Sequence, residues 1–406
     1  MADFTVVGGG VAGLVVARRL ALAGADVVVF EASDRLGGPV ARHEVAGIAL
    51  DAGAESFAVR DGTVAALLRE VDLADDVVAP RPGPAWLQPA SGDPVPLPAT
   101  ALLGIPANPL ADDVVRVVGR RAALRAAELD AEPLAPDWAT RSLGGLIRTR
   151  MGDDMLERLV APVVHGVHSQ HPDTLPLSRA HPRLPDEVAR TGSLAGGVGA
   201  LREAAPPGAA VAGIRGGMHR LVTALAADVT ENGGAIRLRT RVDDPSTLTG
   251  RVVVAAADFT GVAPSGRRID LVTLVVEQGE LDAAPRGSGM LVATGAPVHA
   301  RALTHATAKW EWLRHAAAGR HVLRLSYDET PDDPVATARA DAETLLGVEL
   351  PVVAGSAVVS WTRPAGDEAS GVVPGVEAVV GETVAGSGLA GIVAHAERTA
   401  AALLAR

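Results

Sequence analysis

The sequence contains no cysteine, and aromatic residues make up only 2% of its 406 residues. Without cysteine the chain has no disulfide framework, no thiolate nucleophile and no cysteine-held zinc or iron–sulfur site. With so few aromatic rings, any pocket must be lined mainly by aliphatic and small side chains. Uninterrupted apolar runs of about 18 residues are also missing, so we predict no transmembrane helix. The start of the chain lacks the basic stretch that opens a secretory signal, and we expect no targeting segment.

The balance of charge is negative, with a formal net charge of -11 at pH 7. Such a charge opposes approach to nucleic acid or to an anionic membrane, so we expect no nucleic-acid partner and no membrane insertion. The absence of cysteine fits a cytoplasmic location. Hydrophobic residues make up 48% of the chain. A chain of this length predicts two or three domains around a core that can bury a bulky cofactor.

The N-terminus carries the pattern of a dinucleotide-binding βαβ unit. Residues 4–7 predict a short buried strand, residues 11–23 a helix, and residues 26–31 a second strand. Between the first strand and the helix, Gly8–Gly13 satisfies G-x-G-x-x-G, in which glycines make the turn, admit a pyrophosphate and let helix and strand pack closely. Glu31 ends the second strand, where an acid accepts hydrogen bonds from ribose hydroxyls.

The residues after Glu31 favour FAD over NAD. A basic residue and a glycine pair follow the acid, which is typical of FAD-type Rossmann domains, and the glycine pair lets backbone approach the cofactor. The alternative is a simple glycine turn with a solvated glutamate. We predict that the cofactor is FAD and that this region binds it through Gly8, Gly10, Val11, Ala12, Gly13, Glu31, Ala32, Arg35, Gly37 and Gly38.

A second G-x-G-x-x-G lies at Gly386–Gly391, but only 15 residues follow it. They leave no room for a returning strand and a ribose acid, so this segment is not an independent dinucleotide unit. We predict that a strand at 376–380, the pair Gly381-Glu382 and a closing helix at about 389–405 return to the first domain. They would meet the ribityl-phosphate side of the flavin at a helix N-terminus. An ordinary glycine C-cap turn is the alternative.

The middle of the chain predicts two further regions. A Pro-rich segment at 75–100 predicts a hairpin, and residues 268–327 alternate like antiparallel strands. Residues 109–204 look mostly helical, with one helix starting near Leu110 and another running from Ser142 through Arg158. The predicted fold is α/β, a Rossmann-type FAD-binding domain (1–72, 210–260 and 375–406) with an interleaved antiparallel-sheet substrate domain (73–100 and 261–374) and a helical insert domain (101–209).

Further motifs follow in order along the chain, and together with the N-terminal motif they resemble the flavin-dependent porphyrinogen oxidases. These are the coproporphyrinogen III and protoporphyrinogen oxidases of the monoamine-oxidase-like flavoprotein superfamily. The element from Thr304-His305 to Lys309-Trp310 is the narrower one, and it points to porphyrinogen oxidases rather than amine oxidases or carotenoid desaturases. The other matching stretches are Leu50–Phe57, Leu159–Val167, Gly192–Leu194, Gly213–Leu221, Pro285–Leu291 and Arg324–Tyr327.

The resemblance implies a role in haem biosynthesis, the oxidation of coproporphyrinogen III to coproporphyrin III with oxygen as acceptor. The partners would be a small-molecule porphyrinogen, oxygen and, in transient contact, a ferrochelatase. Coproporphyrinogen would be preferred because its four propionates suit a protein without a membrane segment, with Arg286 and Arg301 meeting them. The resemblance adds further cofactor contacts at Ala52, Gly53, Ala54, Glu55, Val242, Gly381, Glu382, Gly388 and Leu389.

Departures from the family pattern leave alternatives open. The chain is compressed between Val242 and Arg251 and between Trp361 and Gly381, and Ala255–Asp258 stands where members often have Thr-Pro or Ser-Pro. A protoporphyrinogen IX oxidase, another amine-oxidase-superfamily flavoprotein acting on amines or polyenes, and a shortened FAD-binding paralogue of impaired activity are the other interpretations.

Several other residues attract attention without a firm chemical role. Lys309 is the only lysine of the chain, and we expect its stem to pack on Trp310 or Trp312 rather than to act in catalysis. We predict no metal site and assign no catalytic side chain, since a flavin takes hydride from carbon by itself. The loop or interface histidines are His165, His168, His171 and His181, and the candidate partners of substrate carboxylates are Arg148, Arg150, Arg286 and Arg301.

Overall fold

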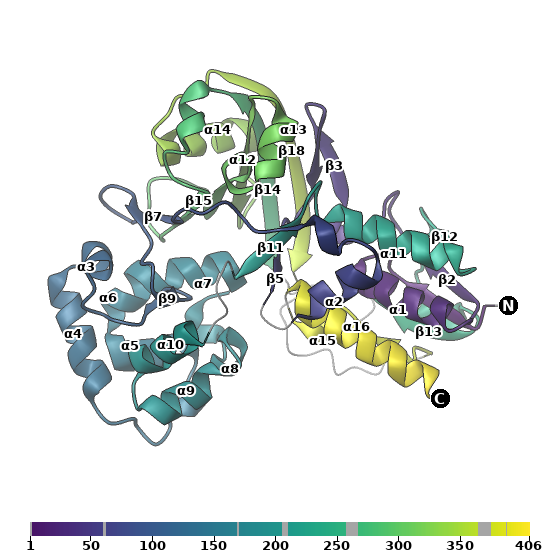
Figure 1. Ribbon diagram of the computed structural model, residues 1–406, viewed down its shortest axis with the longest axis horizontal. Coiled ribbons are helices and arrows are strands. Elements are labelled where there is room, and N and C mark those ends of the chain that lie inside the picture. Colours follow the sequence, from purple (N-terminus) through teal and green to yellow (C-terminus); the bar gives the residue numbers. More distant parts are fainter. Residues whose placement is uncertain are drawn as a thin grey trace.

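The computed structural model describes residues 2–59, 62–168, 170–204, 210–256, 267–363, 375–386 and 388–406. Figure 1 shows a helical block on one side, a large sheet above, and a smaller sheet with both chain ends on the other side. In the described part of the chain, no helix is both long enough and apolar enough to cross a membrane.

The smaller sheet is parallel, with the strand order β12-β2-β1-β13-β19. Its central strand β1 runs beside β2 and β13, and β19 adds the C-terminal segment to the edge. Three helices pack together on this sheet, with α1 in contact with both α11 and α16. The predicted βαβ unit is therefore confirmed. Its elements are β1 (Phe4–Val7), α1 (Val11–Leu22), β2 (Val27–Phe30), α11 (His219–Glu231), β12 (Ala235–Arg237), β13 (Arg251–Val254), β19 (Ala378–Val379) and α16 (Leu389–Leu404).

The larger sheet has the order β18-β14-β17-β16-β15-β7-β8, and its neighbours are antiparallel except for the parallel pair β15–β7. The hairpin predicted within 75–100 is the pair β7–β8 of this sheet. Helix α14 covers one face, where Leu325 and Tyr327 share a core with Ala338. Its elements are β7 (Trp86–Gln88), β8 (Val95–Pro96), β14 (Arg267–Glu277), β15 (Gly289–Val292), β16 (Ala302–His305), β17 (His321–Tyr327), α14 (Pro334–Leu346) and β18 (Val352–Arg363).

The opposite face of the larger sheet carries a hairpin and two short helices. Val275 and Val322 of the sheet share a core with Val45 and Leu50 of the hairpin and with Trp310. The hairpin comes from the N-terminal segment that the sequence assigns to the cofactor domain, so it joins the two sheets. The domain boundaries stay a proposal. The elements here are β3 (Arg42–Val45), β4 (Ile48–Asp51), α12 (Ala306–Lys309) and α13 (Glu311–Ala317).

The helical block agrees with the helical region expected at 109–204, but one predicted helix is wrong. Ser142 does cap a helix, since its side chain accepts a hydrogen bond from the backbone N–H of Gly145. That helix ends at Met151, because Gly152 adopts φ +84 and turns the chain. The block contains α3 (Asp112–Val118), α4 (Arg120–Ala131), α5 (Leu143–Met151), α6 (Asp153–Met155), a π-helical turn (Leu156–Val160), α7 (Ala161–His168), α8 (Leu177–Ala180), α9 (Leu184–Thr191) and α10 (Leu194–Glu203).

The remaining elements connect these parts. The three-stranded sheet β5-β11-β6 lies between the helical block and the parallel sheet in Figure 1. The connecting elements are β5 (Phe57–Ala58), α2 (Thr63–Glu70), β6 (Val77–Val78), β9 (Ala101–Leu102), β10 (Ile105–Pro106), β11 (Val211–Ile214) and α15 (Glu382–Ala385).

Candidate functional site

The glycine-rich turn between β1 and α1 is shaped for an anion. A Cβ at Gly13 would lie 2.0 Å from the carbonyl oxygen of Gly8, so only glycine lets the helix approach the strand this closely. Gly10 precedes the helix, and a Cβ there would meet nothing within 4 Å. The first turn of α1 has no acidic residue and no side-chain cap. The N–H groups of Val11 and Ala12 therefore have no capping side chain, and they carry the positive end of the helix dipole.

Glu31 lies beside this turn and helps to fix it. Its Oε2 accepts a hydrogen bond of 2.8 Å from the backbone N–H of Gly9, and its Oε1 accepts from the backbone and the hydroxyl of Ser33, both at 2.8 Å. The side chain remains partly exposed, and a carboxylate has lone pairs left for further donors. Glu31 can therefore accept from ribose hydroxyls, as the motif predicts, while also holding the turn, which the sequence did not indicate.

The second glycine pair folds back onto the first turn. The backbone N–H of Gly37 donates to the carbonyl of Gly9 at 2.9 Å, and Gly37 and Gly38 both have positive φ, +103 and +55. A Cβ at Gly38 would meet nothing within 4 Å. The backbone here is thus open to a ligand, whereas Ala32 and Arg35 are exposed to solvent.

The stretch at 51–55 is attached to the same turn through the segment 39–41. Ala52 donates its N–H to the carbonyl of Ala41 at 2.8 Å, and Ala54 donates to the carbonyl of Pro39 at 2.9 Å. A Cβ at Gly53 would lie 2.6 Å from the Pro39 oxygen, so this contact also requires glycine. The motifs at 8–13, 37–38 and 51–55 therefore form one continuous backbone surface. We call this surface, Gly8–Gly13 with Gly37–Ala41 and Ala52–Ala54, the nucleotide cradle.

The C-terminal segment closes the cradle from the other side. Val380 donates its N–H to Val254 at 2.8 Å, and Gly381 follows with φ +113. A Cβ at Gly381 would come within 3.8 Å of the Cβ of Ala12. Gly388, also with positive φ, precedes α16, whereas Glu382 starts the short helix α15. Helix α16, which starts within the second glycine motif, packs on α1 of the first βαβ unit, and a role of this motif in cofactor binding stays a prediction.

Val242 and the departures from the family pattern are the other sequence-based predictions that concern this edge of the sheet. Val242 is buried against Val7 and Val254 at the strand ends. The segment before Val242 runs along the end of β2, because Thr240 donates its N–H to the carbonyl of Glu31 at 2.9 Å. The departure at Ala257-Asp258 lies outside the described residues, as do residues 364–374 of the second compressed region.

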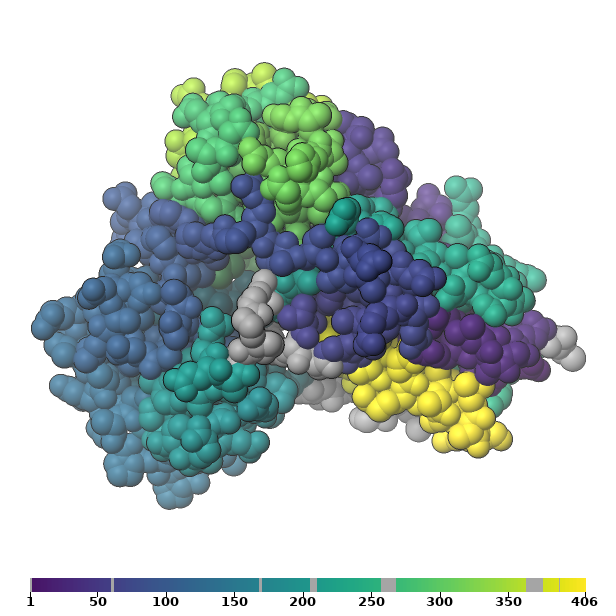
Figure 2. Space-filling view, in the orientation of Figure 1, coloured from purple at the N-terminus to yellow at the C-terminus, as the bar shows by residue number. Residues whose placement is uncertain are grey.

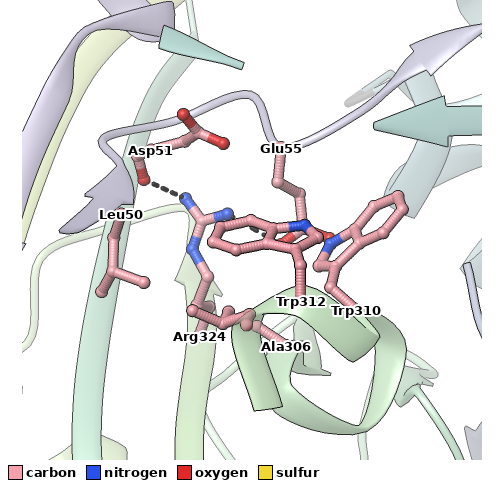
Figure 3. Close-up of a pocket in the computed structure, with 8 residues that line it drawn as sticks. Leu50, Asp51, Glu55, Ala306, Trp310, Trp312 and Arg324 are labelled. Atoms are coloured by element: carbon pink, nitrogen blue, oxygen red, sulfur yellow. Dashed lines mark hydrogen bonds and ion pairs between the residues drawn. The ribbon is translucent and has the colours of Figure 1, made fainter. Parts of the chain in front are cut away.

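An ion cluster joins the cradle to the larger sheet, and Figure 3 shows two of its members, Glu55 and Arg324, beside Trp310 and Trp312. Glu55 follows the cradle directly. Its Oε1 accepts from the Nζ of Lys309 at 2.6 Å, and its Oε2 accepts from Nη1 of Arg324 at 2.9 Å. Nη2 of Arg324 also donates to the carbonyls of Asp51 at 3.0 Å and Gly53 at 2.8 Å. We call Glu55, Lys309 and Arg324 the charged junction.

The charged junction is largely shielded from water. The exposed fractions of the side chains are 6% for Arg324, 16% for Glu55 and 19% for Lys309. Burial alone would raise the pKa of Glu55, but the charges of Lys309 and Arg324 outweigh it and lower the pKa to about 2. Glu55 is therefore ionised at any physiological pH. Beside the junction lies a small cavity of about 10 Å³, lined in part by Trp310 and Trp312, which is room for about one water.

The carboxylate of Asp51 lies next to the junction but has its own partners. It accepts from the backbone N–H groups of Met218 and His219 and contacts Nδ1 of His219, each at 2.9 Å. It thus caps the start of α11, which is where the Gly-Gly-Met-His-Arg-Leu motif lies. The sequence marked this motif only by resemblance, and its partner Asp51 was missed. Arg324 was also missed as a site residue, although it opens a matching stretch.

Lys309 differs from its prediction in part. Its Nζ does lie 5.1 Å from the centre of the Trp310 ring, as a packed stem would allow. Its main partner, however, is Glu55, which sequence spacing gave no means of finding. Nearby, Nε2 of His305 lies 3.1 Å from Nδ1 of His321. Burial, and then the neighbouring His321, lower the pKa of His305 to about 3. Burial also lowers the pKa of His321, so both rings are neutral at pH 7.

Three of the four candidate arginines already have carboxylate partners. Arg150 is buried and pairs with Asp130 at 3.1 Å, which makes it a structural residue of the helical block. Arg148 pairs with three carboxylates, among them Asp153 at 3.1 Å. Arg301 pairs with Asp328 at 2.9 Å, and only 10% of its side chain is exposed.

Arg286 is different from these three. Its guanidinium carbon lies 4.9 Å from the centre of the Trp86 ring, and in the described residues it forms no ion pair with a carboxylate. Of the candidates it is the one whose charge is not already neutralised.

The predicted histidines do not gather around one point. The rings of His165 and His171 meet edge to face with centres 5.2 Å apart, and Nδ1 of His171 accepts from the N–H of Asp173. Across the described residues, no group of three or more His, Asp or Glu side chains is arranged to hold a metal ion. The side chain of His168 lies outside the described part.

The cradle fits a dinucleotide on physical grounds. Glu31, the start of α1 and the two glycine segments lie together at the carboxyl ends of β1 and β2, which is the edge of a parallel sheet where dinucleotides bind. Polar atoms that are buried without a hydrogen-bond partner among the described residues occur beyond it at Thr273 Oγ1, Trp310 Nε1 and Arg324 Nε. Thr273 and Arg324 are direct neighbours across β14 and β17. Figure 2 shows the helical block, the larger sheet and the parallel-sheet region as three parts of the molecular surface.

Comparisons with known proteins agree with this geometry. Residues 11–261 match the family model described as flavin containing amine oxidoreductase. The coproporphyrinogen III oxidase of Mycobacterium tuberculosis (strain ATCC 25618 / H37Rv) is 31% identical over 379 residues, which is 84% of this chain and 79% of the relative. The enzyme of that name from Staphylococcus aureus (strain NCTC 8325 / PS 47) is 24% identical over 78% of this chain and 76% of its own.

Solved structures share the fold. A protein from Exiguobacterium sp. 255-15, provisionally named a protoporphyrinogen oxidase, superposes with a TM-score of 0.82 and 22% identity over 99% of both chains. Cyclohexylamine oxidase from Brevibacterium oxydans IH-35A superposes with a TM-score of 0.66 and 16% identity over 100% of both chains. At 22% and 16% sequence identity, these structural similarities support the fold and not a function.

Proposed function

This chain belongs to the family of flavin-containing amine oxidoreductases, and from that premise we propose that it oxidises coproporphyrinogen III to coproporphyrin III with FAD and oxygen. The chain is thus a flavin-dependent oxidoreductase, and the proposal concerns its substrate, the form of its flavin and its electron acceptor. The observation that carries the substrate is the 31% identity to a coproporphyrinogen III oxidase over 84% of the chain. A ferrochelatase in transient contact would receive the product.

The reaction balances as one porphyrinogen and three oxygen molecules giving one porphyrin and three hydrogen peroxides. FAD, when bound, would supply the hydride acceptor for each two-electron step and the route of the electrons to oxygen. The protein's share is to bind and orient. Glu31 would accept from the adenosine ribose, the N–H groups of Val11 and Ala12 would bind the pyrophosphate, and the segment 51–55 would hold the ring end.

The substrate carboxylates need cations in a protein of net charge -11. Arg301, one of the two arginines expected to meet them, already pairs with Asp328. Arg286 is therefore the remaining candidate of that pair, since a guanidinium binds a carboxylate bidentately.

The proposal is tested by spectrum and by turnover. The purified protein should be yellow with about one FAD, and added coproporphyrinogen III should bleach the flavin without oxygen and form coproporphyrin III with oxygen. The substrate is settled by comparing kcat/KM for coproporphyrinogen III and protoporphyrinogen IX. Equal values, or a preference for protoporphyrinogen IX, would overturn the substrate and leave the flavin assignment intact.

Protoporphyrinogen IX is the second candidate because a relative of that activity also matches. The chloroplastic protoporphyrinogen oxidase 1 of Arabidopsis thaliana is 30% identical over 200 residues, but this is 48% of this chain and 36% of that protein. The longer match therefore favours coproporphyrinogen III. We also expect that NADPH does not reduce the flavin at the rate of turnover, because the second glycine motif belongs to the FAD unit. Rapid bleaching by NADPH in a stopped-flow experiment would contradict this.

A further inference from the structure

The charged junction is connected to the nucleotide cradle by a short path of hydrogen bonds. Arg324 holds the carbonyls of Asp51 and Gly53 from the side of the larger sheet. From the other side, the N–H groups of Ala52 and Ala54 donate to the segment 39–41. The strip at 51–55 is therefore fixed between the two sheets, and its position depends on the three charged side chains at its end.

The charge at the junction is not balanced within it. Lys309 and Arg324 share the single carboxylate of Glu55. The nearby carboxylate of Asp51 is engaged by two N–H groups at the start of α11 and by His219. Because the three junction side chains are at most 19% exposed, a unit change of charge here is screened far less than at the surface.

The direction of the path indicates which part of a bound cofactor the junction meets. Glu31 marks the ribose at one end of the cradle, and the start of α1 marks the pyrophosphate. In this orientation the second half of the dinucleotide would continue past Ala12 toward the strip that carries Gly53 and Glu55, because the N–H groups of Ala52 and Ala54 attach that strip to the segment 39–41 of the cradle. Buried polar atoms without partners in the described residues, Arg324 Nε and Thr273 Oγ1, occur at the same place.

We propose that Lys309 and Arg324 are positioning residues that hold the strip at 51–55 against the flavin ring and that, with Glu55, set the reduction potential of the bound flavin. This inference rests on the proposed binding of FAD and not on the choice of substrate. Transfer of a hydride adds one negative charge to the ring, so a nearby cation stabilises the reduced state relative to the oxidised state. A nearby carboxylate has the opposite effect.

The experiment changes the charge in both directions and measures the flavin's reduction potential in the purified holoprotein. Glu55→Gln removes a negative charge, and we expect the ratio of reduced to oxidised flavin at fixed potential to rise about tenfold, which is about +30 mV for two electrons. Lys309→Met removes a positive charge and should lower that ratio by about the same factor. Lys309→Arg keeps the charge and should restore the original potential.

A matched control is Asp328→Asn, which also removes a carboxylate from an ion pair with an arginine on the same sheet, but at Arg301. In Asp328→Asn the ratio of reduced to oxidised flavin at fixed potential should change less than twofold. A purely structural role for the junction predicts weaker FAD binding in both Glu55→Gln and Lys309→Met without shifts of opposite sign. Unshifted potentials, or shifts of one sign, would overturn the inference.

Folding and flavin binding can be separated from this outcome. If Glu55→Gln does not fold, the pair Lys309→Met and Lys309→Arg still decides the sign of the effect. A wild-type protein that takes up no flavin would overturn the proposed function itself. A yellow wild-type protein whose junction variants keep its potential would overturn only the inference.

Discussion

The nucleotide cradle and the charged junction lie at the two ends of one strip of backbone, yet they are built differently. In the cradle the contacting groups are backbone N–H and carbonyl groups. Gly13 and Gly53 are needed because a side chain at either position would clash with a backbone oxygen. In the junction the contacting groups are long charged side chains from three separate segments.

The difference has an energetic consequence. Backbone groups in the cradle are fixed by the sheet and the helix next to them. Gly13 and Gly53 each allow a close approach of two backbone segments that a side chain would prevent. Charged groups in the junction are stable only as a set, because removing one partner leaves another charge buried without compensation. We therefore expect junction variants to act on the stability of the whole molecule and cradle variants to separate folding from cofactor binding.

The largest effect is expected from Arg324→Met. Loss of the guanidinium leaves Glu55 with one cation and frees two backbone carbonyls, so the free energy of unfolding should fall by about 3–5 kcal/mol. Urea unfolding with FAD removed measures this. Arg150→Met is the matched control, because its partner Asp130 is also buried but lies in the helical block. Arg150→Met should lower the free energy of unfolding by a similar amount and leave the Kd for FAD unchanged. Weaker FAD binding by Arg150→Met would contradict the expected difference between the two regions.

A smaller effect, on affinity, is expected from Glu31→Ala. The change removes a charged acceptor of ribose hydroxyls, worth about 1.5–3 kcal/mol, so the Kd for FAD should rise about 10- to 100-fold. Titration of the apoprotein with FAD provides the measurement. Because Glu31 also holds Gly9 and Ser33, Ser33→Ala serves as the control that weakens this turn but keeps the carboxylate. An unchanged Kd in Glu31→Ala would mean that the acid only shapes the turn.

Two alanine substitutions sharpen the comparison within the cradle. Gly13→Ala places a Cβ 2.0 Å from the Gly8 carbonyl oxygen, so helix and strand must separate, at a cost of about 1–3 kcal/mol in unfolding free energy. Gly10→Ala meets no protein atom within 4 Å and has φ -71, which alanine adopts without strain. We expect stability within about 0.5 kcal/mol of wild type but at least a tenfold weaker Kd for FAD. Normal FAD binding by Gly10→Ala would place the pyrophosphate elsewhere.

The smallest expected effect is on the pH dependence of the free energy of unfolding in acid. The pKa of Glu55 is lowered from 4.5 to about 2, so below pH 4.5 the unfolded chain binds a proton that the native protein does not. Stability is therefore lost as the pH falls from about 4.5 to about 2, at up to about 1.4 kcal/mol per unit for this group. Glu55→Gln should flatten the curve of unfolding free energy against pH in that window. Parallel curves for the two proteins would show that Glu55 is not the group responsible.

Much of the cradle could be predicted from the sequence, because its chemistry depends on local patterns. The spacing from Gly8 to Gly13, the acid at Glu31 and the glycine pair at Gly37 are each fixed by backbone geometry that few other residues allow. The same local logic placed the hairpin at β7–β8 and the closing helix α16. It failed at Gly152, where an extended backbone with φ +84 ends a helix that the flanking residues would continue.

The junction could not be predicted in this way. Glu55 and Lys309 each belong to a recognised stretch, but nothing in either stretch indicates that they touch. The arginine candidates show the same limit, since Arg150 and Arg301 look like substrate ligands until Asp130 and Asp328 are seen to neutralise them.

The sequence by itself determined the cofactor end of this protein, where strand, glycine turn, helix and ribose acid follow one another within one βαβ unit. Only the tertiary structure decided how the strip at 51–55 is held, because packing determines which chain segments meet in an ion pair, and the sequence of one segment does not identify its partner. The hairpin β3–β4 is the element that makes this possible. It leaves the parallel sheet, packs on the larger one through Val45 and Leu50, and so delivers Glu55 to Lys309 and Arg324.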